Sequence, residues 1–115
     1  MTEQAIRINT RDGQDVFTTD IFEGKLDAVI VRIPPTSIQK ITLMIESELG
    51  YFILNRKDLE GVEYIAPRKR AVTQVSDKMR LQDIPSMDKF NLNERLIITV
   101  MGPKNIDVDL ILRLD

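Results

Sequence analysis

The chain has 115 residues, of which 43% are apolar and 30% charged, and its formal net charge is −2. This length suits one domain with one core, and the apolar content excludes a disordered chain. Histidine and cysteine are both absent. Their absence excludes disulfides, thiol nucleophiles and the side chain most used as a general acid or base near neutral pH.

No apolar run approaches the roughly 18 residues of a membrane span. The N-terminal residues show no apolar core of a secretory signal. We therefore expect a protein that is made in the cytoplasm and does not span a membrane.

Apolar and polar residues alternate along much of the chain, a pattern typical of half-buried β-strands. In chain order, the predicted strands cover residues 5–9, 16–19, 26–33, 38–45, 51–54, 62–65, 71–75, 96–101 and 106–114. Asp12-Gly13 is a favoured turn dipeptide and predicts that the first two strands pair as a hairpin. Pro34-Pro35 ends the third strand, because proline cannot donate to a ladder.

The clearest alternation is at the C-terminus. There every second residue is apolar: Ile106, Val108, Leu110, Leu112 and Leu114. These residues predict one buried face of a strand. Residues 96–101 form an apolar, β-branched run, and Gly102-Pro103-Lys104-Asn105 supplies a turn. The two strands are therefore predicted to form a hairpin.

Residues 77–95 interrupt this pattern, because they contain Pro85 and irregularly spaced apolar residues. We interpret them as a long connection, such as the one that crosses the end of a Greek key. The predicted fold is a single all-β, mainly antiparallel domain over residues 1–115. It is a β-sandwich, jelly-roll-like or a small barrel, with one long connection around 77–95.

Carboxylates are the remaining candidates for catalysis or cation binding. Asp107 and Asp109 would share a strand face, and an acidic loop cluster consists of Asp12, Asp15, Asp20 and Glu23. Calcium needs about six to eight oxygen ligands, and no loop here is that rich in acids. A solvated strand face explains the pair, and turn or edge positions explain the cluster. We expect no catalytic residues, no cofactor and no metal site, hence no enzyme.

The charge is unevenly distributed. Residues 56–80, the basic segment, carry seven bases and four acids, whereas residues 1–55 and 81–115 are net acidic. The candidate interaction surface consists of Arg56, Lys57, Tyr64, Arg68, Lys69, Arg70, Lys78 and Arg80. It is interpreted as a solvated loop or protected edge strand, as a contact with the acidic flanks of another copy, or as a nucleic-acid contact. Net acidity and the absence of tryptophan disfavour nucleic acid.

One segment resembles a known class of proteins. Glu94-Arg95-Leu96-Ile97-Ile98-Thr99-Val100-Met101-Gly102-Pro103, followed by Val108 to Leu114, is similar to the final hairpin of small β-sandwich structural proteins of phage and other viral particles. The resemblance implies a capsid, decoration or tail-connector subunit that works in symmetric copies. It implies no site residues.

We therefore expect a structural or assembly protein that binds copies of itself or other particle subunits and is assembled into a virion. A module that binds carbohydrate or peptide through its loops is one alternative. The other is nucleic-acid contact through the basic segment. Only 5% of the residues are aromatic, which counts against carbohydrate binding.

Overall fold

The computed structural model describes residues 2–34, 40–73 and 84–115. All regular secondary structure in these residues is β. The strands are β1 (Thr2–Asn9), β2 (Gln14–Thr18), β3 (Phe22–Arg32), β4 (Ile41–Ser47), β5 (Phe52–Leu59), β6 (Val62–Ile65), β7 (Lys69–Thr73), β8 (Ile84–Asp88), β9 (Phe90–Glu94), β10 (Leu96–Met101) and β11 (Asp107–Leu114). In the same residues, no helix is long and apolar enough to cross a membrane.

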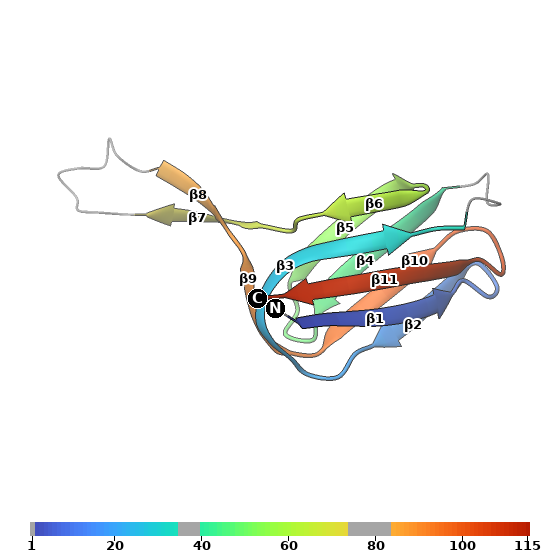
Figure 1. Cartoon of the computed structure of the whole chain (residues 1–115), viewed down its shortest axis with the longest axis horizontal. Coiled ribbons are helices and arrows are strands. Elements are labelled where there is room, and N and C mark those ends of the chain that lie inside the picture. The colour runs from blue at the N-terminus through green and yellow to red at the C-terminus, as the bar shows by residue number, and fades with distance from the viewer. Residues whose placement is uncertain (1, 35–39, 74–83) are drawn as a thin grey trace.

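Two antiparallel sheets pack face to face (Figure 1). Sheet A has the order β1-β11-β3-β6, with β9 also paired to β3, and sheet B has the order β2-β10-β4-β5. Early strands pair with late ones, β1 with β11 and β2 with β10, while the chain alternates between the sheets. This is the arrangement of a jelly roll. The predicted all-β sandwich is confirmed, and the sheets are not closed into a barrel.

The core lies between the sheets and is built from the predicted alternation. In β11, Val108, Leu110 and Leu112 are fully buried, as the C-terminal pattern predicted. In β4, every second residue from Ile41 to Ser47 is buried. β4 and β11 thus each supply one apolar face to a core closed from both sides, and burial of this kind is the main stabilising contribution to the fold.

Both predicted hairpins are wrong. β10 belongs to sheet B and β11 to sheet A, and β2 and β1 are divided in the same way. The residues 102–106 and 10–13 therefore carry the chain across from one sheet to the other. A turn sequence marks where the chain reverses, but it does not decide whether the next strand lies beside the first or opposite it.

The long connection predicted around 77–95 is wrong for residues 84–94, which form β8 and β9. Residues 77–83 lie outside the described residues. Pro85 is tolerated in β8 because a two-stranded ribbon consists of edge strands. In β9, Phe90 and Leu92 are buried and Asn91 is exposed, but the third inward position is the charged Glu94, so only two apolar residues mark this strand in the sequence.

Buried threonines support several of the crossings of the chain between the sheets. The Thr10 hydroxyl donates to the Pro103 carbonyl and accepts from the Ile106 backbone N–H at 2.9 Å. The Thr19 hydroxyl likewise accepts from the Leu96 N–H at 3.0 Å. Neither threonine is more than 2% exposed, so their hydroxyls replace water for backbone groups that leave the ladders.

We predict that Thr10→Val lowers the free energy of unfolding by about 2 kcal/mol, because valine keeps the shape but leaves the Ile106 N–H and the Pro103 carbonyl without this partner. Chemical denaturation followed by circular dichroism measures the change. Thr10→Ser keeps the hydroxyl and is the control, with a smaller loss. Equal stability of Thr10→Val and the parent protein would contradict the assignment.

Candidate interaction surface

A β-hairpin arm projects from one end of the sandwich. It consists of β7 and β8, in which Lys69 lies opposite Asp88 and Thr73 opposite Ile84. In the described part of the chain, these two strands pair only with each other. Figure 1 shows the ribbon extending away from both sheets. The longest dimension of the molecule is 57 Å, against 27 and 25 Å for the others.

The arm is inserted into the middle of an edge strand of sheet A. β6 and β9 pair with the same edge of β3, with Ile65 opposite Val29 and Phe90 opposite Leu26. Only Asp27 and Ala28 lie between these two β3 positions. β6 and β9 therefore occupy the place of one strand, and the chain leaves that strand to form the arm and returns to it.

An ion cluster closes the gap at which the arm leaves; we call Asp27, Arg68, Lys89 and Asp115 the arm root. Lys89 Nζ lies 2.9 Å from Asp27 Oδ1 and also donates to the Asp115 carboxylate. The Arg68 guanidinium donates to the Asp27 carbonyl at 3.0 Å and lies 3.6 Å from its carboxylate. Arg68 precedes β7 and Lys89 follows β8, so both strands of the arm are held at Asp27.

The position of Asp115 in this cluster depends on Gly24 in β3. The Asp115 backbone N–H donates to the Lys25 carbonyl at 2.8 Å. Gly24 has a φ of +130°, and a Cβ there would lie 2.9 Å from the Asp115 carbonyl oxygen. Only glycine accepts both this conformation and this close approach. The glycine thus lets Asp115 reach Lys89.

The contacts of the arm root shift the pKa values of Asp27 and Lys89. The hydrogen bond from Lys89 lowers the pKa of Asp27, and the hydrogen bonds to Asp115 and Asp27 raise the pKa of Lys89. A carboxylate with a lowered pKa in the folded state stabilises that state above its ordinary pKa. This stabilisation is lost as the pH falls through the lowered value. The hold on the arm is therefore complete at neutral pH and weakens in acid.

A buried carboxylate fixes the strand that follows the arm. Glu94 in β9 is 4% exposed. It accepts hydrogen bonds from the Ser47 hydroxyl and, at 2.8 Å, from the Tyr51 hydroxyl. Ser47 ends β4, and Tyr51 follows in the β4–β5 turn. Glu94 therefore ties the end of sheet A that carries the arm to sheet B.

A groove of about 590 Å³ lies beside the arm root, between β5 and β9. Aromatic and cationic side chains line it, among them Tyr51, Phe52, Phe90, Arg68 and Lys69. The rings of Tyr51 and Phe90 stack with their centroids 6.1 Å apart, while Phe52 is 61% exposed. Such a groove offers apolar contact and positive charge to an acidic, partly apolar segment of a partner.

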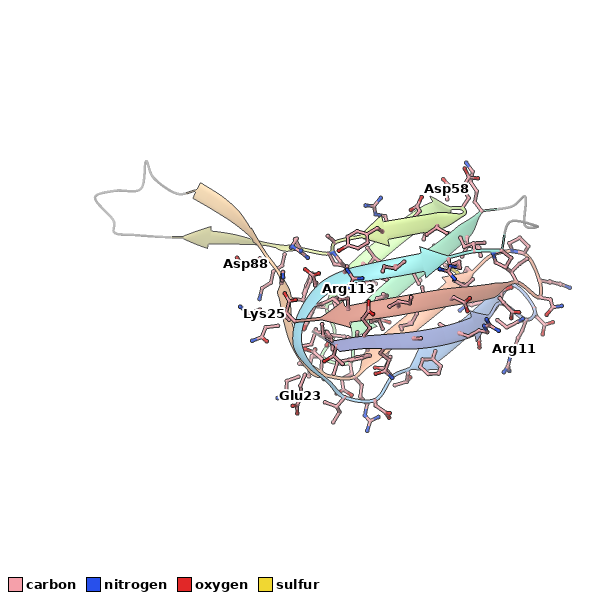
Figure 2. The ribbon with its side chains drawn as sticks, in the orientation of Figure 1. Arg11, Glu23, Lys25, Asp58, Asp88 and Arg113 are labelled. Carbon is pink, nitrogen blue, oxygen red and sulfur yellow. The ribbon has the colours of Figure 1, made fainter. Side chains whose placement is uncertain are left out.

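The structure divides the predicted interaction surface. Arg68 and Lys69 lie together at the foot of the arm, whereas Arg56 and Lys57 are exposed on β5 of sheet B. Tyr64 lies on sheet A, with the Arg113 guanidinium 5.9 Å from its ring centroid. Figure 2 labels Arg113, and also Asp88 at the foot of β8.

The remaining basic positions have no described side chain. Arg70 lies in β7, but its side chain is outside the described part of the structure. Lys78 and Arg80 lie outside the described residues altogether.

Three members of the arm root were missed from the sequence. Asp27, Lys89 and Asp115 are far apart along the chain and match no motif. One signal was available: Asp27 interrupts an otherwise apolar stretch of β3, between Leu26 and Ala28. A charge inside such a strand indicates a local partner, although the sequence does not identify it.

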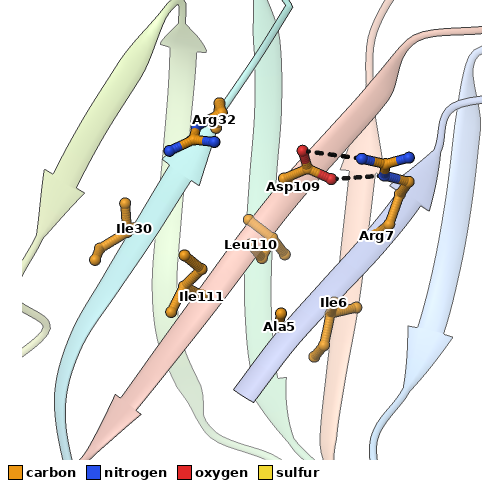
Figure 3. A pocket seen from close by; sticks show the side chains of 8 residues that line it. All are labelled: Ala5, Ile6, Arg7, Ile30, Arg32, Asp109, Leu110 and Ile111. Atoms are coloured by element: carbon orange, nitrogen blue, oxygen red, sulfur yellow. Dashed lines mark hydrogen bonds and ion pairs between the residues drawn. The ribbon is translucent and has the colours of Figure 1, made fainter. Parts of the chain in front are cut away.

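Both acidic residues of the strand pair singled out in the sequence have partners. Asp109 accepts from Arg7 at 2.8 Å, and Asp107 accepts from Asn9 at 2.8 Å. Within the described ranges, no group of three or more acidic side chains is placed to hold a metal ion. The Arg7–Asp109 pair borders a second concavity, of about 360 Å³, on the outer face of sheet A (Figure 3). Its floor includes Ile30 and Ile111.

Comparison of the chain with models of known protein families, with curated proteins and with solved structures finds no match. The jelly-roll order of the strands is a fold-level property, and one fold of this kind hosts many unrelated functions. Function must therefore be inferred from the arm, its root and the molecular surface.

We predict that Asp27→Asn loosens the arm, because the charge shared by Arg68 and Lys89 is removed. Hydrogen exchange of the β7 and β8 amides, read by mass spectrometry, should become severalfold faster at neutral pH. In the parent protein the same increase should occur only in acid, once intrinsic exchange rates are corrected for. Asp20→Asn is the control, since Asp20 is an exposed partner of Arg95. Unchanged arm protection in Asp27→Asn would contradict the role of the root.

Proposed function

We propose that the protein is a non-enzymatic assembly subunit, a structural component of a particle such as a virion, that acts through contacts between symmetric copies and with neighbouring subunits. The observation that carries this proposal is the arm. It is a two-stranded ribbon, held at its foot and extended away from the domain core.

Within the described residues, β7 and β8 pair only with each other and belong to neither sheet of the sandwich. An isolated two-stranded hairpin is marginally stable in water, and a hydrophobic face covered by other elements is what normally stabilises it. The outer edges of β7 and β8 also leave backbone donors and acceptors that another strand can use. A neighbouring subunit that covers the ribbon or pairs with its edge would supply both contributions.

The arm root supports the same function by limiting the freedom of the arm. Asp27 holds Arg68 before β7 and Lys89 after β8, while Glu94 anchors β9 to sheet B. A segment held in its bound direction loses less conformational entropy on association. The arm root thus restricts the direction in which the ribbon extends from the sandwich.

Nucleic-acid binding is the second candidate, favoured by one specific observation. A two-stranded β-ribbon fits the major groove of DNA, and this ribbon starts with Arg68, Lys69 and Arg70. The net charge of −2 opposes it, because nucleic-acid-binding domains usually carry a basic surface. The arm therefore favours protein contacts, and DNA binding is an outcome that the experiment can reveal.

An armless variant tests the proposal without disturbing the sandwich. Deletion of residues 67–88 joins Ala66 to Lys89, and these two residues then face Ala28 and Asp27 between the Ile65–Val29 and Phe90–Leu26 pairs. The register is continuous, and Lys89 keeps Asp27 as a partner. The variant should fold with an intact β spectrum and cooperative unfolding.

We predict that the full chain forms concentration-dependent species larger than a dimer in native mass spectrometry and light scattering. The armless variant should not form them, because the projecting ribbon has been removed. Identical mass distributions for both proteins would overturn the proposal. Binding of duplex DNA at low salt by the full chain but not by the armless variant, without larger protein species, would assign the arm to nucleic acid instead.

A further inference from the structure

The outer face of sheet B is almost free of charge. Leu43, Ile45 and Ile98 are fully buried in the core, so the alternate positions of β4 and β10 point outward. At these positions lie Met44, Ile97, Thr99 and Met101, flanked by Val16 of β2 and Phe52 of β5. Val16 is 51% exposed and Phe52 is 61% exposed. Across β2, β4 and β10, all of which are fully described, Glu46 is the only ionisable residue at an outward position, whereas edge strand β5 adds the exposed Arg56 and Lys57.

The outer face of sheet A is different. It carries the ion pairs Arg7–Asp109 at 2.8 Å and Arg113–Glu3 at 3.0 Å, together with exposed Arg32. This is the usual pattern of an antiparallel sheet with one solvated face. The same fold therefore contains one face suited to water and one depleted of charge. Depletion of charge with enrichment of methionine and aromatic residues distinguishes the centre of a protein interface from other surface.

The size and chemistry of this face select its partner. Four strands about 4.8 Å apart, each with about six residues rising about 3.3 Å, cover roughly 19 by 20 Å. A charged partner surface would lose its hydration over β2, β4 and β10 without gaining a counter-charge, except at Glu46. A second copy of the same sheet has equal area, equal twist and equally little charge. Two such sheets pack with their strands within about 30° of each other, and use of the same patch on both copies closes a two-fold contact.

We propose that the outer face of sheet B binds the same face of a second copy, so that the protein forms a two-fold dimer with four sheet layers. The choice of a second copy as partner rests on the proposed function, whereas the surface is separate from the arm. Val16, Thr99 and Met44 lie on adjacent strands at directly paired positions; Thr99 is only 8% exposed, so Val16 and Met44 on either side of it form the middle row of the contact. Glu46 is the residue whose charge limits its affinity.

Two exposed valines provide a matched test. Val16 lies on edge strand β2 of sheet B, and Val62, 66% exposed, lies on edge strand β6 of sheet A. Val16→Lys places an unpaired charge in the proposed contact and should weaken dimerisation about tenfold or more in sedimentation velocity. Val62→Lys should leave the dimer unchanged. At a concentration at which all three proteins are monomeric, both variants should keep the parental thermal midpoint, because neither valine is in the core.

Glu46→Gln tests the same surface in the opposite direction, since removal of the one outward charge of β2, β4 and β10 should make the dimer severalfold tighter. A parent protein that stays monomeric, or a Val16→Lys protein that dimerises as well as Val62→Lys, would overturn the inference. The armless variant separates it from the proposed function. If that variant still dimerises but forms no larger species, both proposals hold. If the armless variant loses all association while Val16→Lys associates like the parent protein, the proposed function of the arm is supported and the proposed sheet B contact is overturned.

Discussion

The edge of β3 carries two partner strands in turn, and the position of the arm follows from this constraint. β6 ends opposite Val29 and β9 begins opposite Leu26. The chain therefore leaves sheet A to form the arm, and returns to it, within the two β3 positions between these pairs, Asp27 and Ala28. On the opposite edge, the pairing with β11 shifts register at the same level. Asp27 is thus the extra residue of a bulge, a feature that re-aims side chains and ends regular pairing. The arm root forms where backbone pairing stops, and its ion pairs hold the two strands of the arm at this point.

The sandwich around this point follows from simple alternation, which is why its strands could be predicted and their partners could not. β4, β9 and β11 show the period of two throughout, and β11 is the clearest example. The local signals of a hairpin and of a crossing between sheets are the same, however: a reversal marked by glycine, proline or asparagine. In this protein, crossings between the sheets are supported by Thr10 and Thr19. Their buried hydroxyls bind backbone groups of segments far away in the sequence. β7 and β8 gave a weak signal because a ribbon outside the core needs no apolar face.

The candidate surfaces were predictable to different degrees for the same reason. Arg68 and Lys69 stand out as a local concentration of charge, so the foot of the arm could be found in the sequence. Their partner Asp27 lies about forty residues earlier in the chain and could be recognised only as a charge inside an apolar strand. The uncharged face of sheet B was not visible at all. Val16, Met44 and Thr99 come from three separate segments, and they form one row only when the register of β2, β10 and β4 is known.

The two proposed contacts differ in symmetry, and together they determine what the protein could build. A sheet face that binds itself is satisfied by two copies and cannot extend further. An arm that binds a different surface of a neighbour is a heterologous contact, which continues until it closes into a ring or propagates as a filament or lattice. A dimer joined through sheet B would carry two arms, one from each sandwich, because the arm leaves from the β3 edge of sheet A and leaves sheet B free. Each dimer would then act as a two-armed unit. Acid, by protonating Asp27, would weaken the extending contact and leave the apolar, charge-poor dimer contact in place.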